Sequence, residues 1–427
     1  MKNLSVEIEI NGKSLYVGNI SGNDYRDACF NYATEYLGLE NARAISISLP
    51  LTNQIYNADV TRNFFEGLLP EGFMRRSVAK WMRTDENDYL SILAGLGSEC
   101  LGAIKIIDNS IKGQEPCYVK LTVEEVRSLA KEGALESVQL VTKAHLSLTG
   151  ASGKVGLYYD EANDDWYLPI GEAPSTHIVK QSHIRLKKIV TNEQLCLLTA
   201  KYLGISIPES FIINLGSSND EEVLFATKRY DRKLEGSKHT LDGLTVPYRL
   251  HQEDFAQALG IPAVHKYEKS EEGYMKKMFE VIRLYSSEPI VDQLRLWEIC
   301  IFNYLVGNTD NHIKNFSLVY SEDVKNVRLA PAYDIISTMI YENSTEDMAM
   351  SIGGVYDINK IDRSAFERQA RIVGLGVNLA MKSYDAIVSK FTDALNKARV
   401  ELEDQGYDGV DEIYNKILSN GGIKNYK

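Results

Sequence analysis

The amino-acid sequence predicts an α+β protein of two lobes, one rich in strands and one helical, preceded by a further N-terminal module. Short apolar runs between turn residues fill the first half, whereas apolar residues recur at helical spacing beyond about residue 245. The 427 residues also exceed the size at which a single core usually divides. We expect an N-terminal module at 1–110, a strand-rich lobe at 111–240 and an all-helical lobe at 241–427.

The N-terminal module is predicted from three segments. Residues 4–20 resemble two strands joined by "NGK", because Asn-Gly is a strong hairpin signal. Residues 24–38 resemble a helix that stops at Gly38, and "CLGAIKIID" (100–108) resembles a buried strand.

The middle segment is predicted to be a sheet with one inserted helix, after an opening segment that begins with a capped first turn. A helix at 121–133 has Thr122 as its N-cap before a first turn rich in glutamate. Thr191 and Gln194 have the spacing of a capping box, and Gly204 is a natural helix stop. The predicted strands are "AHLSL", "KVGLYYD", "DWYLPI", "HIVKQ", "SFIINL" and "VLFATKRYD".

Composition limits the possible functions. Lys and Arg total 47 against 59 Asp and Glu, so the formal charge of −12 argues against a chain whose whole surface binds nucleic acid. No apolar run is long enough for a membrane span, and the first residues do not resemble a secretory signal. Five scattered cysteines form no disulfide or zinc pattern, so we expect a reducing, cytoplasmic location.

The most informative stretch is "GNTDNHIKNFSLVY" (307–320), which places Asp310 and Asn315 five residues apart, with Asp334 following in "PAYDIIS". Phosphoryl transfer requires a carboxylate that holds the acceptor hydroxyl, and magnesium prefers oxygen ligands. An Asp-x-x-x-x-Asn loop and a later aspartate supply both. Each of these two features alone also has a non-functional explanation. Asp-x-x-x-x-Asn occurs often by chance, and Asp334 could be an aspartate that stabilises a turn.

Two further segments suit the phosphate end of a nucleotide. Lys180 lies in the apolar run "THIVKQ", and Gly150 and Gly153 lie in "SLTGASGKVGLYY", where glycines let backbone N–H groups approach an anion. The second segment is not a P-loop, since the Gly-x-x-x-x-Gly-Lys-Ser/Thr pattern is not met. An edge-strand lysine and a tight hairpin are the alternatives. The order of turn, strand lysine, helix, acid loop and second acid is the order that a bilobal kinase requires.

The chain resembles the HipA-like serine/threonine kinases, the toxin halves of HipA–HipB-type toxin–antitoxin systems. "NTDNHIKNFSLV" resembles that family's Asn-x-Asp-x-His-x-Lys-Asn-x-Ser loop, and "PAYDIIST" resembles its second metal motif. The phrases "NFFEGLLPEG", "GSECLGAIKI", "THIVKQ", "KRYDR" and "RLHQEDFAQALG" also match in place. The resemblance runs from about residue 4 to beyond 390, and it implies a HipA-like bilobal kinase fold.

The resemblance implies roles for the matching residues. Asp310 would be the catalytic acid/base, while Asn315 and Asp334 would ligate Mg²⁺. In the strand-rich lobe, Lys180 would contact the ATP phosphates. The remaining nucleotide contacts that it implies are Gly150, Ser152, Gly153 and Lys154 in the phosphate loop, Lys228 and Tyr230 at the hinge, and His312, for which a structural role in the acid loop is the alternative.

Two features of the phosphate loop bear on this comparison, one at Ser147 and one at Ser152 and Gly153. Ser147 stands where the family autophosphorylates a serine, and a phosphate there would carry a charge of about −1.5 to −2 into a loop meant for another anion. A plain strand serine is the alternative. Ser152 and Gly153 replace two longer polar residues that are common in the family, so this loop departs from the family pattern.

The resemblance thus implies an ATP- and Mg²⁺-dependent kinase that phosphorylates a cytoplasmic protein, for which an aminoacyl-tRNA synthetase is the family precedent. A HipB-like helix-turn-helix antitoxin would restrain it, and any DNA contact would come through that partner. Two other interpretations stay open at this point. One is a small-molecule phosphotransferase, and the other is a nucleotide-binding co-repressor or scaffold without turnover.

Overall fold

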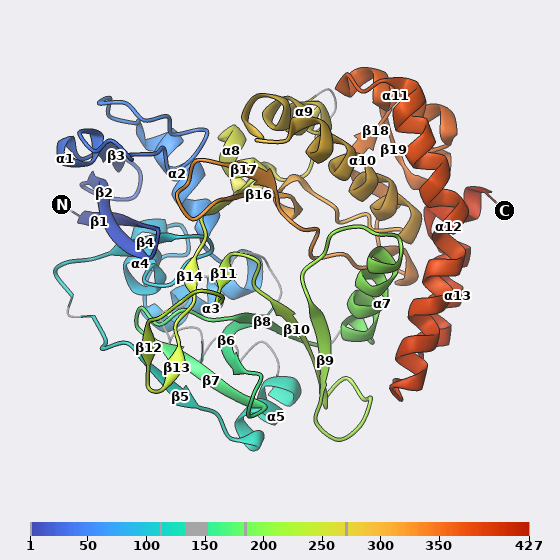
Figure 1. Cartoon of the computed structure of the whole chain (residues 1–427), viewed down its shortest axis with the longest axis horizontal. Helices are drawn as coiled ribbons and strands as arrows, with labels where there is room; N and C mark the ends of the chain where they lie inside the picture. The colour runs from blue at the N-terminus through green and yellow to red at the C-terminus, as the bar shows by residue number, and fades with distance from the viewer. Residues whose placement is uncertain are drawn as a thin grey trace. The chain divides into compact units, whose positions relative to one another are not determined.

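The computed structural model describes residues 2–111, 113–132, 140, 153–182, 186–269 and 272–426. The contacts between Cα atoms group the chain into two compact units. Unit 1 comprises residues 1–181, 226–263 and 318–327, and unit 2 comprises 182–225, 264–317 and 328–427. This grouping differs from the three sequence segments 1–110, 111–240 and 241–427, which stay a prediction. The mixed α+β class is confirmed (Figure 1).

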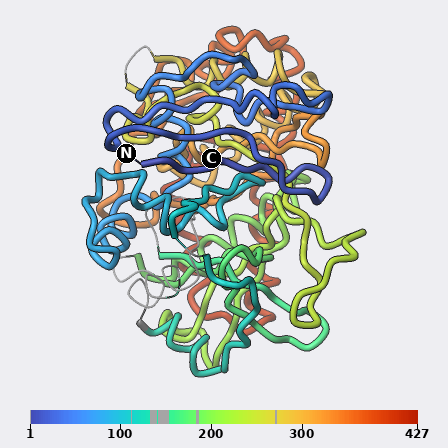
Figure 2. Tube along the Cα trace, turned by 90° about the vertical axis from the view of Figure 1, so that its left-hand side faces the viewer, coloured from blue at the N-terminus to red at the C-terminus, as the bar shows by residue number. Residues whose placement is uncertain are grey.

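Unit 1 begins with a four-stranded sheet in the order β3-β2-β1-β4. The Asn-Gly hairpin is confirmed, because β1 and β2 pair antiparallel around Asn11 and Gly12, both of which have positive φ. Figure 2 shows these blue strands side by side. The strands are β1 (Lys2–Ile10), β2 (Lys13–Gly22), β3 (Cys29–Tyr32) and β4 (Ile104–Ile107), and the helices that follow β3 are α1 (Thr34–Leu37), α2 (Ala58–Phe65), α3 (Gly72–Met82) and α4 (Tyr89–Leu96).

The helix predicted at 24–38 is wrong over most of its length, since β3 and the short α1 occupy its second half. The cause is local. The Asp27 carboxylate accepts hydrogen bonds from the backbone N–H groups of Asn23 (2.8 Å) and Asp24 (3.0 Å), which stabilises a turn instead of a helix.

A second group of strands in unit 1 carries four antiparallel neighbours in the order β5-β7-β6-β8. The strands predicted from "KVGLYYD", "DWYLPI" and "HIVKQ" are confirmed with their predicted bounds, and "AHLSL" lies outside the described residues. Thr122 caps α5 as predicted, in a capping box with Glu125. The bounds are β5 (Cys117–Lys120), α5 (Val123–Glu132), β6 (Lys154–Asp160), β7 (Asp165–Ile170) and β8 (His177–Gln181).

The rest of unit 1 consists of short strands and one capped helix. The chain enters this part through β10, which spans the division between the two units. The elements are β10 (Val223–Lys228), β11 (Arg232–Lys233), β12 (Thr240–Leu241), β13 (Leu244–Thr245), β14 (Tyr248–Arg249), β15 (Gln252–Asp254), α8 (Phe255–Leu259) and β16 (Ser317–Tyr320).

Unit 2 is built mainly of helices around a core of buried aromatic and aliphatic side chains that includes Trp297, Phe302 and Phe391. Its longest helix, α12, packs against both α7 and α10. The elements are α7 (Ile189–Tyr202), β9 (Ser210–Asn214), α9 (Tyr274–Tyr285), α10 (Pro289–Val306), β17 (Val327–Leu329), β18 (Asp347–Ile352), β19 (Val355–Asp357), α11 (Arg363–Val373), α12 (Val377–Asp404) and α13 (Val410–Asn420).

Two predictions about residues 191–427 need correction. The capping box at Thr191 is wrong, because α7 begins at Ile189, where the Asp220 carboxylate accepts the backbone N–H of Lys188 at 3.0 Å. Residues 241–427 are not all helical. They include several short strands, among them the β18–β19 hairpin, which turns on Gly353 and Gly354 at positive φ.

A buried ionic network joins the N-terminal sheet to the later strands of unit 1. Glu99 is fully buried and accepts hydrogen bonds from Arg229 (3.1 Å), Arg232 (2.8 Å) and Arg249 (2.9 Å). Burial raises the pKa of Glu99, but attraction to the three arginines outweighs burial and leaves that pKa below its ordinary value. Breaking such a buried pair typically costs about 3–5 kcal/mol, because a charge is left uncompensated.

Asp231 completes the network. Its carboxylate accepts from Arg229 at 2.7 Å and from the backbone N–H of Gly102 at 2.6 Å. Glu9 pairs with Arg249 at 3.3 Å, so three arginines face three carboxylates. Residues of the segments "GSECLGAIKI", "KRYDR" and "RLHQEDFAQALG" meet at this network.

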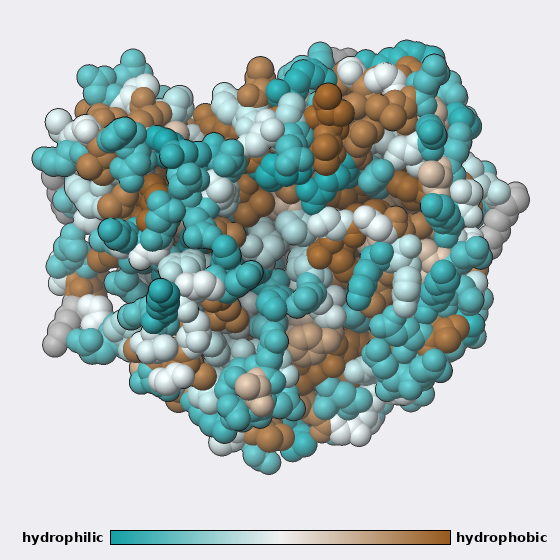
Figure 3. All heavy atoms as spheres, in the orientation of Figure 1, coloured by the Kyte–Doolittle hydropathy of each residue, from teal (hydrophilic) through white to brown (hydrophobic). Residues whose placement is uncertain are grey.

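Most of the surface in Figure 3 is hydrophilic, with smaller hydrophobic areas between the polar side chains. In unit 2, exposed apolar side chains gather where α9 ends and α10 begins, at Leu284, Tyr285, Ile290 and Val291. Within the described ranges, no helix has the length and apolar character needed to cross a membrane.

A second buried acid lies close to the N-terminal module. Glu253 in β15 accepts hydrogen bonds from Ser46 Oγ (2.5 Å), from the backbone N–H of Ile47 (3.1 Å) and from the Tyr320 hydroxyl. Burial nevertheless raises the pKa of Glu253 to about 7. Burial lowers the pKa of His251, two residues before Glu253, to about 4, so this histidine is neutral near pH 7.

These shifts predict a pH-dependent effect of Glu253→Gln. Between pH 4.5 and about 7, folded Glu253 keeps a proton that the unfolded chain has lost, so the parent loses stability as pH rises through this window. Urea unfolding should show that the free energy of unfolding of the variant, relative to that of the parent, rises by on the order of 3 kcal/mol from the lower to the higher pH. The opposite contribution of His251 is common to both proteins and cancels. Glu115→Gln, at an exposed position, is the control, and a difference constant with pH would contradict the prediction.

Candidate active site

The loop predicted to carry the catalytic acid follows α10 in unit 2 and is fixed by backbone and hydroxyl contacts. Gly307 ends α10 at φ 77°, a conformation that glycine adopts without strain. The carbonyl of Gly307 accepts from the N–H of Thr338 at 3.0 Å, and Thr309 N–H donates to Thr338 Oγ1 at 2.8 Å. Asn308 adds a side-chain bond to Asn303 Oδ1 at 2.7 Å. The chain immediately before Asp310 therefore has little freedom.

Asp310 and Asn315 are tied together within this loop. The Asp310 carbonyl accepts from Asn315 Nδ2 at 3.0 Å and from the backbone N–H of His312 at 2.8 Å. Asp310 itself is exposed, whereas His312 is buried. The structural interpretation of His312 is supported by its backbone bonds, because its carbonyl also accepts the N–H of Asn315 at 2.9 Å. The predicted base and the predicted metal ligand thus belong to one rigid turn.

Asp334 lies in a segment that contacts the same loop. The hydroxyl of its neighbour Tyr333 donates to the Lys314 carbonyl at 3.0 Å and bonds Ser317 Oγ at 2.6 Å. Asp334 adopts φ 56°, in the left-handed region, which is uncommon for a non-glycine residue although aspartate tolerates it better than most. A backbone held in this way is often found at functional sites.

The donor set suits Mg²⁺. Asn315 Nδ2 is committed to the Asp310 carbonyl, so the other end of the amide, Oδ1, is the end presented as a ligand. An amide oxygen and the Asp334 carboxylate are hard oxygen ligands, and magnesium usually takes one or two of these plus phosphates and water. The two predicted metal ligands are therefore chemically appropriate and lie in segments joined by Tyr333.

Asn192 in α7 is a site residue that sequence reasoning missed. It is fully buried, and its amide makes reciprocal bonds with the backbone of Ser337, accepting from N–H and donating to the carbonyl, both at 3.0 Å. Asn192 Nδ2 also donates to the Tyr341 hydroxyl at 3.3 Å, and burial raises the pKa of Tyr341 to about 12, so this phenol stays neutral. The helix therefore holds the segment that follows Asp334. The run of polar residues at 191–194, which the structure buries, is the sequence feature that could have indicated this role, but it was interpreted as a helix cap.

A second missed residue is Tyr267. Its hydroxyl donates to Asp310 Oδ1 at 2.6 Å, and its ring meets the His312 ring edge to face, with centroids 5.3 Å apart. No sequence pattern marks Tyr267, because it lies in a loop far from the acid motif along the chain.

In unit 1, the two predicted phosphate-binding lysines are direct partners in the sheet. Lys154 in β6 and Lys180 in β8 are paired Cα to Cα in an antiparallel register, with Gly156 opposite Ile178 two residues further. Paired residues project from the same face of a sheet, so the two lysine side chains lie next to each other. Gly153 directly precedes β6, whereas Ser147, Gly150 and Ser152 lie outside the described residues.

The two predicted hinge residues make side-chain contacts within unit 1. Lys228 Nζ donates to Glu161 Oε1 at 3.3 Å, in a largely exposed pair of the kind that contributes little to stability. The Tyr230 hydroxyl donates to Gln252 Oε1. Residues 229 and 231, which alternate with them, point into the ionic network around Glu99.

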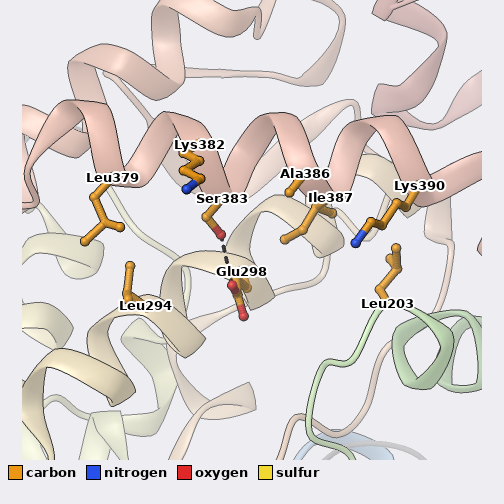
Figure 4. A pocket seen from close by; sticks show the side chains of 9 residues that line it. All are labelled: Leu203, Leu294, Glu298, Leu379, Lys382, Ser383, Ala386, Ile387 and Lys390. Carbon is orange, nitrogen blue, oxygen red and sulfur yellow. Dashed lines mark hydrogen bonds between the residues drawn. The ribbon is translucent and has the colours of Figure 1, made fainter.

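The cavity drawn in Figure 4 lies elsewhere in unit 2. It holds about 380 Å³ and is lined by none of the predicted site residues. Leu294 and Glu298 of α10 face Leu379 and Ser383 of α12, and Ser383 Oγ donates to Glu298 at 2.9 Å. Lys382 and Lys390 complete the α12 side together with Ala386 and Ile387, and Leu203 closes the end.

An acid loop that also carries an asparagine, a second acid on a supported segment and, in the other unit, a pair of strand lysines are the kinds of residue that phosphoryl transfer in protein kinases uses. Comparison with known proteins identifies the family. A model of the HipA-like C-terminal domain matches residues 146–398, and a model of the HipA N-terminal domain matches residues 8–107. The chain therefore belongs to the HipA family of serine/threonine protein kinases, and ATP is the phosphoryl donor that this membership implies.

Individual relatives agree along almost the whole chain. The "Putative kinase Y4mE" of Sinorhizobium fredii is 31% identical over 395 residues, which are 91% of this chain and 90% of that protein. The "Serine/threonine-protein kinase toxin HipA" of Shewanella oneidensis is 24% identical and covers 92% of this chain and 89% of its own. A solved complex of HipA, HipB and operator DNA from Shewanella oneidensis contains a chain with a TM-score of 0.77 and 20% identity, covering 97% of this chain and 96% of that one. That structure supports the fold.

Asn192→Ala should weaken both stability and phosphoryl transfer. The change leaves the fully buried Ser337 backbone without its partner, which costs about 1–3 kcal/mol, and loosens the segment that follows Asp334. We expect a lower urea midpoint and phosphoryl transfer reduced at least ~10-fold under conditions where the variant is folded. Thr199→Ala, which removes another buried side-chain bond from the same helix, is the control that should retain activity. Full activity in a folded Asn192→Ala protein would show that the bonds between Asn192 and Ser337 do not position Asp334.

Proposed function

We propose that this chain is an ATP- and Mg²⁺-dependent protein kinase of the HipA toxin type that phosphorylates a serine or threonine of another cytoplasmic protein. The observation that carries the proposal is the acid loop of unit 2, where Asn315 is bonded to the Asp310 carbonyl, next to the supported Asp334 segment. Bound MgATP supplies the phosphoryl group.

In unit 2, Asp310 accepts the proton of the acceptor hydroxyl as that oxygen attacks the terminal phosphorus. Its exposure lets a protein substrate reach the carboxylate, and the ties at Thr309 and Asn315 keep it in place. Asn315 Oδ1 and the Asp334 carboxylate hold Mg²⁺, and His312 supports the turn.

In unit 1, Lys154 and Lys180 neutralise the ATP phosphates. Their antiparallel pairing supports this role, because it places both side chains on one face of the sheet, where both can reach the same phosphates. Gly150, Ser152 and Gly153 bring the phosphate loop close to the nucleotide, and Lys228 and Tyr230 lie beside the adenine. The three-part division at 1–110, 111–240 and 241–427, with a bilobal kinase formed by the last two parts, is the architecture that this function implies.

The proposed partner rests on a relative, and the proposed substrate rests on the family resemblance of the sequence. Because the Shewanella structure is a complex of HipA with HipB and operator DNA, we propose a HipB-like antitoxin for this chain, with DNA contact through it. The net charge of −12 supports an indirect DNA contact. An aminoacyl-tRNA synthetase is the proposed class of substrate, and phosphorylation of Ser147 is the proposed self-regulation.

The direct test is the intact mass of the purified protein after incubation with Mg²⁺ and ATP. The parent should gain one phosphate that maps to Ser147, and Asp310→Ala should gain it about 10²–10⁴-fold more slowly, because the general base is lost. Asp385→Ala removes an exposed aspartate of α12 and should behave like the parent.

Two results would contradict the proposal. Equal rates in the parent and Asp310→Ala would remove Asp310 from catalysis. ATP binding without transfer, to itself or to a cell extract, would favour a nucleotide-binding scaffold, and transfer only to a sugar or amino alcohol would favour a small-molecule phosphotransferase.

A further inference from the structure

The hydrogen bond between Tyr267 and Asp310 involves the atom of Asp310 that matters for catalysis. Tyr267 Oη donates to the carboxylate oxygen Oδ1 at 2.6 Å. The Tyr267 side chain is 47% exposed, so this contact forms at the surface of unit 2, where a protein substrate can reach it. Both residues belong to unit 2.

The backbone on both sides places Tyr267 opposite Asp310. Ala349 in β18 donates its N–H to the Thr309 carbonyl at 3.0 Å, and its own carbonyl accepts the N–H of Glu268 at 2.9 Å. Ala349 therefore links Thr309, which precedes Asp310, to Glu268, which follows Tyr267. Such a shared tie sets the distance between the two side chains independently of the surface around them.

Further contacts hold the same segment. The Glu268 carboxylate bridges two backbone N–H groups, those of Tyr274 and Ser351, each at 2.6 Å. The edge-to-face contact of the Tyr267 and His312 rings, at 87°, fixes the direction of the phenol. The segment is thus anchored on its C-terminal side, and its aromatic ring is seated against the acid loop.

The Tyr267 hydroxyl contacts Asp310 in the same way that the hydroxyl of a protein acceptor would. A kinase base must lie within about 2.6–3.2 Å of the oxygen whose proton it takes, and an acceptor serine or threonine presents an O–H donor there. Tyr267 Oη is also an O–H donor at such a distance. We propose that Tyr267 is a positioning residue whose hydroxyl holds the place of the acceptor hydroxyl on Asp310 and gives it up when a protein acceptor binds. This inference rests on the proposed role of Asp310 as the base.

The consequence is protection of ATP against water. In hydrolysis, a water oxygen forms a bond to the terminal phosphorus, the bond from that phosphorus to the bridging oxygen of ADP breaks, and the water proton passes to Asp310. With Tyr267 in place, water has to compete with a held hydroxyl for the same carboxylate oxygen. ATP is then consumed mainly when a protein acceptor displaces the tyrosine.

The test is Tyr267→Phe, measured by phosphate release from MgATP without any protein acceptor. The variant keeps the ring and its contact with His312 and removes only the hydroxyl, so phosphate release should rise about tenfold above that of the parent. Tyr285→Phe is the matched control, since Tyr285 is 48% exposed in the same unit, and it should release phosphate at the parent rate. A merely structural role would give a loss of activity and not this gain.

The outcomes separate the two proposals. A rise in Tyr267→Phe that disappears in Tyr267→Phe combined with Asp310→Ala supports the inference. Phosphate release equal to or below that of the parent overturns it, including the case in which no protein releases phosphate above Asp310→Ala. The role of Asp310 is judged separately, by the intact-mass comparison of the parent with Asp310→Ala.

Discussion

The fold of unit 1 depends on Glu99, a fully buried carboxylate that three arginines from distant segments surround. Without those arginines, burial would strongly oppose the charge, and without Glu99 the arginines would repel one another in a low-dielectric interior. The network therefore specifies which strands meet: the end of the N-terminal module, the residues after β10 and the strand β14. It also fixes the segment that contains Tyr230, so the structural charge cluster and the proposed hinge are parts of one chain segment.

Local chemistry made much of the fold predictable. The Asn11–Gly12 hairpin, the cap at Thr122 and the strands β6, β7 and β8 follow from turn residues, capping and apolar runs that act within a few residues. One of the two failures has a non-local cause, and the other has a local one. The α7 start depends on Asp220, 32 residues away from Lys188, and the turn at Asp27 competes with the predicted helix through side-chain bonds.

In the candidate site, too, features that are local in the sequence could be recognised, whereas contacts that form only on folding could not. Asp310, Asn315 and Asp334 could be proposed as site residues from the sequence, because motif spacing and oxygen-ligand chemistry can be recognised along the chain, and their roles stay predictions. Asn192 and Tyr267 could not, since each acts on a segment that only folding brings near, through Ser337 in one case and through the Asp310 carboxylate in the other. The pair formed by Lys154 and Lys180 could be predicted only in part. Each lysine was predicted alone, but their opposed register in β6 and β8 is a property of the sheet.

The central claim is that Asp310 and Asp334 have separate roles, one toward the acceptor hydroxyl and one toward the metal. Electron paramagnetic resonance of Mn²⁺, as a replacement for Mg²⁺, measures metal binding in the presence of ADP and tests this claim directly. We expect Asp334→Asn to weaken Mn²⁺ binding at least ~10-fold, because it removes a charged oxygen ligand, and Asp310→Asn to bind Mn²⁺ about as the parent does. Parent-like Mn²⁺ binding by Asp334→Asn would contradict the account.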